Sequence, residues 1–150
     1  MNAFVKFGAA ALVFAAAAPA SAGSVAACLG HSQDRNGVTS FDGYTVAVSA
    51  AADVDAAMLR QEAETGFEER YGDPGRVICE THSGSGHYVV VGGGVELNGA
   101  VRNLIGFGFG PTRSAALADS DNRLNNIHEY NVFQHSGGRL TILEEGEIGG

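Results

Sequence analysis

The pattern of apolar and polar positions predicts six short strands and two helices. Strands are expected at residues 44–49, 77–82, 88–97, 100–109, 130–134 and 139–144. One helix is expected between a capping Asp53 and Gly72, and the other from Arg113 to Ile127. The order β-α-β-β-β-α-β-β predicts an α+β fold, a two-layer sandwich with two helices on a mainly antiparallel sheet of about five or six strands.

The clearest local signal is Asn98-Gly99, which joins two apolar runs. Asn-Gly is favoured in two-residue type I′ turns, so the runs predict a β-hairpin. Such a turn also fixes the register of the two strands. It places Leu97 opposite Ala100, Val90 opposite Phe107 and Tyr88 opposite Phe109.

Residues 1–22 predict a secretory signal peptide. Lys6 precedes an apolar run from Phe7 to Ala18, and Ala20-Ser21-Ala22 is a small-x-small cleavage site. The run is shorter than the ~18 residues that a membrane-spanning helix needs. We therefore expect an exported protein, periplasmic or extracellular and without a transmembrane segment, with an N-terminal tail at residues 23–42 and one α+β domain at residues 43–146.

The chain has two cysteines, Cys28 and Cys79. In an oxidising compartment this even count predicts one disulfide, which would tether the tail to the domain. No Cys-x-x-Cys pair is present, so we expect a structural bond. Val25-Ala26-Ala27-Cys28 also resembles a lipoprotein processing box, and the alternative is a protein anchored through an acylated Cys28.

The net charge is −8 at pH 7 and becomes −9 once Lys6, the single lysine, is removed with residues 1–22. An acidic surface repels phosphates and favours basic partners or divalent cations. Gly106-Phe107-Gly108-Phe109 resembles the centre of the RNA-recognition-motif signature, but Ile105 stands where that family has a basic residue. The negative charge opposes the attraction that dominates nucleic-acid affinity, so we expect no nucleic-acid partner.

Two histidines, His82 and His87, flank the flexible stretch Ser83-Gly84-Ser85-Gly86, and Glu80 shares one side of its strand with His82. Imidazole and carboxylate ligands suit zinc or copper. Glu80, His82 and His87 are thus the candidate ligands of a weak metal site. This gives one hypothesis for the function, a metal-binding protein or metal-assisted hydrolase, and no other cofactor is predicted.

The stretch Ser83-Gly84-Ser85-Gly86-His87-Tyr88 also resembles the Ser-Gly loop followed by tyrosine of bacterial periplasmic lysozyme inhibitors. The resemblance implies that Ser83, Ser85, His87 and Tyr88 enter the cleft of a basic enzyme. An acidic, exported, disulfide-bonded protein would suit that partner electrostatically.

Signals for catalysis are missing from the sequence. It has no Gly-x-Ser-x-Gly elbow, and outside residues 1–22 it has no lysine that could complete a phosphate-binding loop. These observations favour a non-enzymatic interaction or binding domain whose partner is another protein or a small ligand. Binding is expected through residues 83–87 or through the aromatic, glycine-rich hairpin at 88–109.

Overall fold

The computed structural model describes residues 23–51, 54–72 and 75–149, and the predicted signal peptide lies outside them. Over these residues the chain forms six strands and three helices. The strands are β1 (Ser24–Gln33), β2 (Thr39–Ser49), β3 (Arg76–Ser83), β4 (Gly86–Leu97), β5 (Ala100–Gly110) and β6 (Thr141–Ile148), and the helices are α1 (Ala56–Tyr71), α2 (Arg113–Leu124) and α3 (His128–His135). No helix within the described ranges is long and apolar enough to cross a membrane.

The described chain folds as two successive ββαβ units with the same strand topology, and in the second unit the helical part consists of two helices, α2 and α3. In the first unit β1 pairs antiparallel with β2 and β3, which gives the strand order β2-β1-β3. In the second unit β4 pairs in the same way with β5 and β6, which gives the order β5-β4-β6. The first strand of each unit is therefore the central strand of its sheet.

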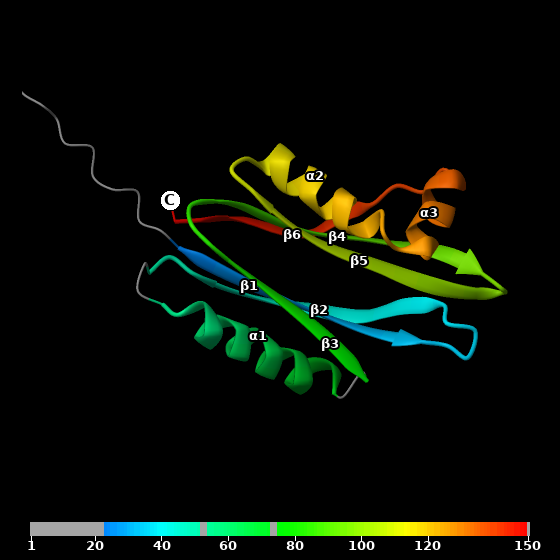
Figure 1. Ribbon diagram of the computed structural model, residues 1–150, viewed down its shortest axis with the longest axis horizontal. Helices are drawn as coiled ribbons and strands as arrows, with labels where there is room; N and C mark the ends of the chain where they lie inside the picture. The colour runs from blue at the N-terminus through cyan, green and yellow to red at the C-terminus, as the bar shows by residue number, and fades with distance from the viewer. Residues whose placement is uncertain (1–22, 52–53, 73–74, 150) are drawn as a thin grey trace, which may run out of the picture.

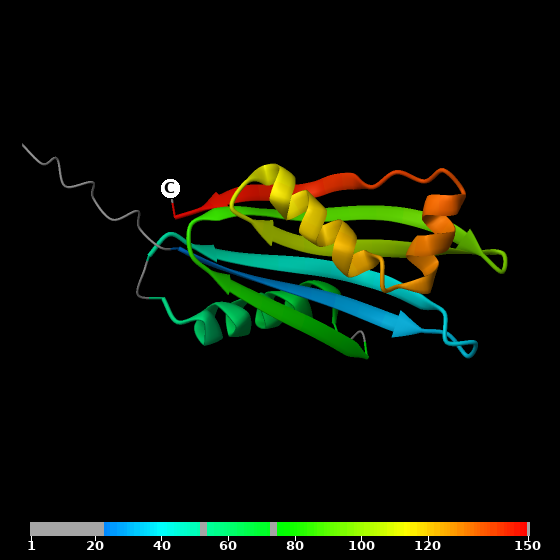
Figure 2. The same cartoon turned by 45° about the horizontal axis from the view of Figure 1, so that its top comes forward.

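The two sheets stack face to face, and helices cover their outer faces (Figure 1, Figure 2). Helix α1 packs on the first sheet, and α2 and α3 pack on the second. Val25, Val90 and Phe107 belong to the apolar core between the sheets. The predicted two-layer sandwich with one sheet is therefore wrong, because the described chain has four layers, α/β/β/α, whereas the α+β class and the antiparallel pairing are confirmed.

The predicted N-terminal tail, residues 23–42, forms β1 and the beginning of β2. Val25, Ala26, Ala27 and Cys28 are at most 2% exposed. They are buried because α1 covers one face of β1 and the second sheet covers the other. A strand buried on both faces shows no alternation of apolar and polar residues, which explains why the pattern did not reveal β1.

Residues 130–134, predicted as a strand, belong to helix α3, so the predicted final hairpin is wrong. Tyr130 and Phe133 are three residues apart, which places both on the helix face that packs against the second sheet. Short apolar runs do not distinguish a strand from a buried helix. The preceding helix, α2, ends at Leu124 rather than at Ile127, and Ile127 is the N-cap residue of α3.

The β4–β5 hairpin is confirmed with its predicted register. Leu97 lies opposite Ala100, Val90 opposite Phe107 and Tyr88 opposite Phe109. Asn98 and Gly99 have φ angles of 54° and 75°. Positive φ at both central residues is what a type I′ turn requires.

The predicted disulfide between Cys28 and Cys79 is present and joins the neighbouring strands β1 and β3. Cys28 is fully buried in the apolar cluster beneath α1. The disulfide occupies the sulfur atom that acylation would use, so a bridged Cys28 and the lipid-anchored alternative are mutually exclusive.

Candidate binding groove beside the edge strand β2

A stripe of three buried residues holds helix α1 against the first sheet. Leu59, Ala63 and Phe67 are at most 3% exposed and pack toward β1. The helix begins after Asp55, whose carboxylate accepts a hydrogen bond of 3.0 Å from the backbone N–H of Ala57. The N-cap is therefore Asp55, whereas Asp53, the predicted cap, lies outside the described residues.

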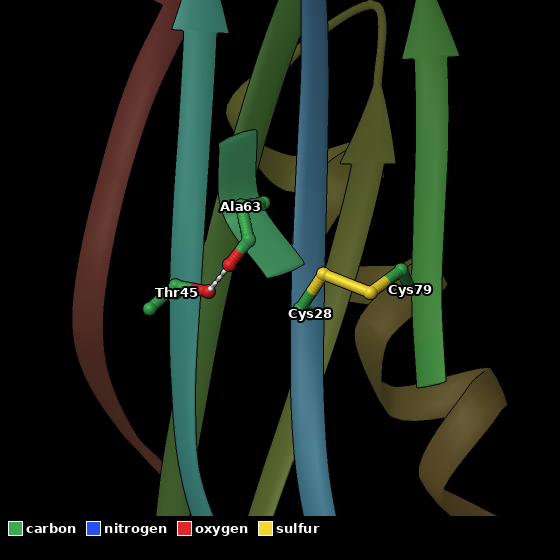
Figure 3. The surroundings of a disulfide bond; sticks show 4 residues. All are labelled: Cys28, Thr45, Ala63 and Cys79. Atoms are coloured by element: carbon green, nitrogen blue, oxygen red, sulfur yellow. Dashed lines mark hydrogen bonds between the residues drawn. A yellow bond between two sulfur atoms is a disulfide. The ribbon is translucent and has the colours of Figure 1, made fainter. Parts of the chain in front are cut away.

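One hydrogen bond joins α1 to the edge strand β2. The hydroxyl group of Thr45 donates to the backbone carbonyl of Ala63 over 2.6 Å (Figure 3). The Cys28–Cys79 bridge lies on the far side of this bond and links β1 to β3 (Figure 3). The hydrogen bond holds α1 to β2, and the disulfide holds β1 to β3, so the positions of the helix and the sheet relative to each other are fixed.

Two glycines let the aromatic residues of α1 approach the sheet closely. A Cβ atom at Gly30 would overlap the ring of Phe67, and one at Gly43 would lie 2.5 Å from the ring of Tyr71. Real Cβ atoms do not tolerate such contacts, because interiors are packed to crystal-like density. The glycines therefore set the height of α1 above β1 and β2.

A groove of about 820 Å³ runs between β2 and α1. One wall is the stretch of β2 from Thr45 to Ser49, and the other is the side of α1 that carries Met58. Strand β2 is at the edge of its sheet in the described structure, so one side of its backbone faces the groove without a strand partner. Val48 and Met58, both in the lining, are 43% and 66% exposed.

The groove is acidic. Glu62 and Glu69 both line it and are both exposed to solvent. They are seven residues apart on α1, which places them on one side of the helix, about 10 Å apart along its axis. Among the described residues that line the groove, no arginine or lysine offsets these two charges.

The residues expected to bind a partner form the connection between the two sheets. Ser83 ends β3, Gly86 begins β4, and Tyr88 is 8% exposed in the core between the sheets. The hydroxyl group of Ser24 donates to that of Ser83 over 3.1 Å. The stretch is therefore tied to β1, while Ser83 and Ser85 are exposed to solvent, and lysozyme inhibition stays a prediction.

The three predicted metal ligands make separate contacts. Glu80 pairs with Arg123 of α2, and the ring of His82 stacks on Phe109 with ring centroids 3.2 Å apart. His87 precedes Tyr88 on β4 and therefore points to the opposite face of that strand from the core between the sheets. In the described part of the chain no group of three His, Cys, Asp or Glu side chains could hold a metal ion, and metal binding stays a prediction.

A second polar cluster lies in a cleft of about 370 Å³ between α2, α3 and β6. The Tyr130 hydroxyl donates a hydrogen bond to the carboxylate of Asp121. Burial and then Asp121 raise the pKa of Tyr130 to about 12. The phenol is thus held in its neutral, hydrogen-bonding form, which ties α2 to α3.

Comparisons of the chain with protein-family models, with curated protein sequences and with solved structures found no match. Function is therefore inferred from the chemistry of the site, since a fold alone does not specify a function.

The groove was not predicted from the sequence. Glu62 and Glu69 were expected only as part of the polar surface of a helix, which is the ordinary place for such residues. The one sequence signal is Met58, an apolar residue outside the stripe of Leu59, Ala63 and Phe67. Met58 beside Glu62 and Glu69 indicates a contact surface only once the structure shows that the edge strand β2 lies next to them.

Proposed function

We propose that this protein is an exported interaction domain that binds an extended, basic segment of a partner protein along β2. The groove beside the free edge of β2, with Glu62 and Glu69 on its rim, is the observation that carries the proposal. An extended peptide adds to a sheet edge through main-chain hydrogen bonds, and side-chain contacts supply specificity. The disulfide and the predicted signal peptide support export.

The walls of the groove suit an added strand. The residues of β2 that face α1 are small: Thr45, Ala47 and Ser49 alternate with residues directed toward the other sheet. Their small size leaves room for the side chains of a bound segment. Met58 would lose its exposure to water when the segment binds, which favours binding.

Charge selects the class of partner. Side chains on one face of an extended segment are about 7 Å apart when they are two positions apart in sequence and about 13 Å apart when they are four positions apart, so two flexible Lys or Arg side chains on the face toward α1 can reach Glu62 and Glu69, which are about 10 Å apart along the helix axis. The overall charge of −8 also steers basic partners toward the protein. Glu64 and Glu68 of the same helix do not line the groove, so they offer a matched control.

The proposal is tested by selecting binders from a random eight-residue peptide display library. We expect enriched peptides with two or more Lys or Arg residues and alternating apolar positions. Their affinity, measured by fluorescence anisotropy, should fall at least tenfold for Glu62→Lys/Glu69→Lys and less than twofold for Glu64→Lys/Glu68→Lys. Amide NMR shifts on binding should concentrate in residues 45–49 of β2.

Two results would contradict the proposal. One is a library that yields no binder above background. The other is a set of binders whose affinity responds equally to the two double variants, because both change the net charge by the same amount and only one changes the groove.

A further inference from the structure

A partly open apolar cavity lies between the two sheets, and none of its lining residues lines the β2 groove. Its volume is about 190 Å³. Its walls come from β1, β2, β3, β5 and the junction of α2 and α3, with Ala27, Leu29, Phe41, Ile105, Phe107 and Ile127 among them.

The cavity exists because small residues stand where larger ones would close it. Ala27 of β1 lies opposite Glu80 of β3, and in the second unit Val90 lies opposite Glu144 in the equivalent place. Gly106 of β5 also lines the cavity, and a Cβ atom there would lie 2.7 Å from Leu124, so the glycine lets α2 lie close to this strand. Ala27 therefore leaves space in the first unit that the larger Val90 fills at the equivalent position of the second unit.

The lining of the cavity is almost entirely carbon. The polar groups beside it are Glu80 and Arg123, which form an ion pair with each other at the mouth. Ile78, which also lines the cavity, is 43% exposed. A charged ligand would lose its hydration with no free partner inside, whereas an apolar ligand would cover Ile78 and fill the void.

From this geometry we infer that the inter-sheet cavity binds one small, uncharged apolar molecule, of the size of a single aromatic ring with one or two carbon substituents. A cavity of about 150 Å³ lined by Leu, Ile and Phe stays dry and holds benzene, so about 190 Å³ accommodates a slightly larger ring compound. This site is separate from the β2 groove and from the proposed protein partner. It gives the domain a second binding activity, for a small hydrophobic ligand.

The inference is tested with toluene as the probe and methyl NMR as the readout. Toluene should shift the methyl signals of Leu29, Ile105 and Ile127 in a saturable manner, with a dissociation constant of about 1 mM or tighter. Ile78→Trp places a large side chain at the mouth and should weaken binding at least tenfold. Val101→Trp, at a position that is 70% exposed and does not line this cavity, should leave binding unchanged.

The Ile78→Trp variant could fail to fold, so a second variant and a second measurement test the inference without it. Ala27→Val copies the residue of the other unit and should weaken toluene binding by partly filling the void. Crystals of the unchanged protein under xenon pressure should show xenon beside Ile105 and Phe107. Methyl shifts that do not saturate, equal binding by Ile78→Trp and Val101→Trp, or xenon absent from the cavity would each overturn the inference.

The test also separates this site from the groove. Glu62→Lys/Glu69→Lys should leave toluene binding unchanged, because neither residue lines the cavity. Loss of toluene binding in that variant would show that the two sites are not independent and would overturn the assignment of a separate site.

Discussion

Glu80 of β3 and Glu144 of β6 occupy equivalent positions in the two ββαβ units. Glu80 lies opposite Ala27 of the central strand β1, and Glu144 lies opposite Val90 of the central strand β4. Both carboxylates therefore point toward the layer between the sheets, at the third strand of their own unit.

Each of these glutamates contacts a residue of the other unit. Glu80 accepts a hydrogen bond from Arg123 of α2, and burial and then the charge of Glu144 raise the pKa of Tyr44 of β2. Glu144 also accepts a hydrogen bond of 3.2 Å from the hydroxyl group of Tyr88. Glu80 of the first unit thus contacts the second unit, and Glu144 of the second unit contacts the first. The two units are therefore joined by polar groups at the margins of their shared apolar core.

Glu144→Gln is expected to lower the pKa of Tyr88. Burial first, and then the charge and hydrogen bond of Glu144, raise the pKa of Tyr88 to about 12. Glutamine keeps a hydrogen-bond acceptor but removes the negative charge that opposes ionisation. An NMR titration of the Tyr88 ring measures the change, and Tyr130, whose raised pKa depends on Asp121, is the internal control. A Tyr88 titration that does not move would show that Glu144 has no such effect.

Tyr88→Phe is expected to change how stability depends on alkaline pH. The pKa of Tyr88 is raised from 10.0 to about 12 on folding, so its contribution to stability is fully present below pH 10 and is lost as the pH rises through about 12. The free energy of unfolding, measured in urea at several pH values, should therefore fall less steeply between pH 10 and 12 in the variant. Equal slopes in the two proteins would contradict this linkage.

Phe109→Ala is expected to raise the pKa of His82. Partial desolvation of His82, whose ring stacks on Phe109, lowers this pKa below 6.5, and the charge of Asp119 opposes the effect only in part. The contribution of His82 to stability is therefore present above pH 6.5 and lost as the pH falls through the lowered pKa. A proton NMR titration should give a value closer to 6.5 in the variant, while Val101→Ala, also on β5, should leave the titration unchanged.

Gly108→Ala is expected to destabilise the protein by about 1–3 kcal/mol. A Cβ atom at Gly108 would overlap the carbonyl oxygen of Ala116 and lie 2.5 Å from the backbone nitrogen of Ser120, so α2 would have to move away from β5. At Gly94 of β4 a Cβ atom would make ordinary contacts, 3.5 Å to Val101 and 3.8 Å to the carbonyl oxygen of Arg102, and Gly94→Ala should stabilise the strand by up to about 1 kcal/mol. Urea unfolding of the two variants provides the comparison, and equal effects would show that the approach of α2 to β5 is not limited by Gly108.

Local chemistry explains which parts of the fold were predictable. The register of the β4–β5 hairpin follows from Asn98-Gly99, because the turn type determines how the two flanking strands align. The apolar stripe of α1 follows from the helical period, because one face of the helix is buried and the other is exposed. Neither prediction needs knowledge of residues far away in the sequence.

Long-range packing explains what was missed. Strand β1 has no alternating pattern, because it is buried between α1 and the second sheet. The repetition of the ββαβ unit is visible only in the pairing of strands, since the two units share topology more than sequence. The groove likewise requires that Thr45 and Ala63, which are 18 residues apart, be held together by a hydrogen bond.

Replacing both cysteines with alanine is expected to lower the free energy of unfolding by about 2–4 kcal/mol. The bridge closes a loop with a sequence separation of 51, and a loop of that length restricts the unfolded chain strongly. Cys28 lies beneath α1, so the change should also loosen that helix locally. Urea unfolding measures the first effect, and hydrogen exchange should show faster exchange in α1 than in the unchanged protein, with α2 as the control because it packs on the other sheet. A loss below about 0.5 kcal/mol, or equal acceleration in α1 and α2, would show that the bridge does not stabilise the wall of the groove in this way.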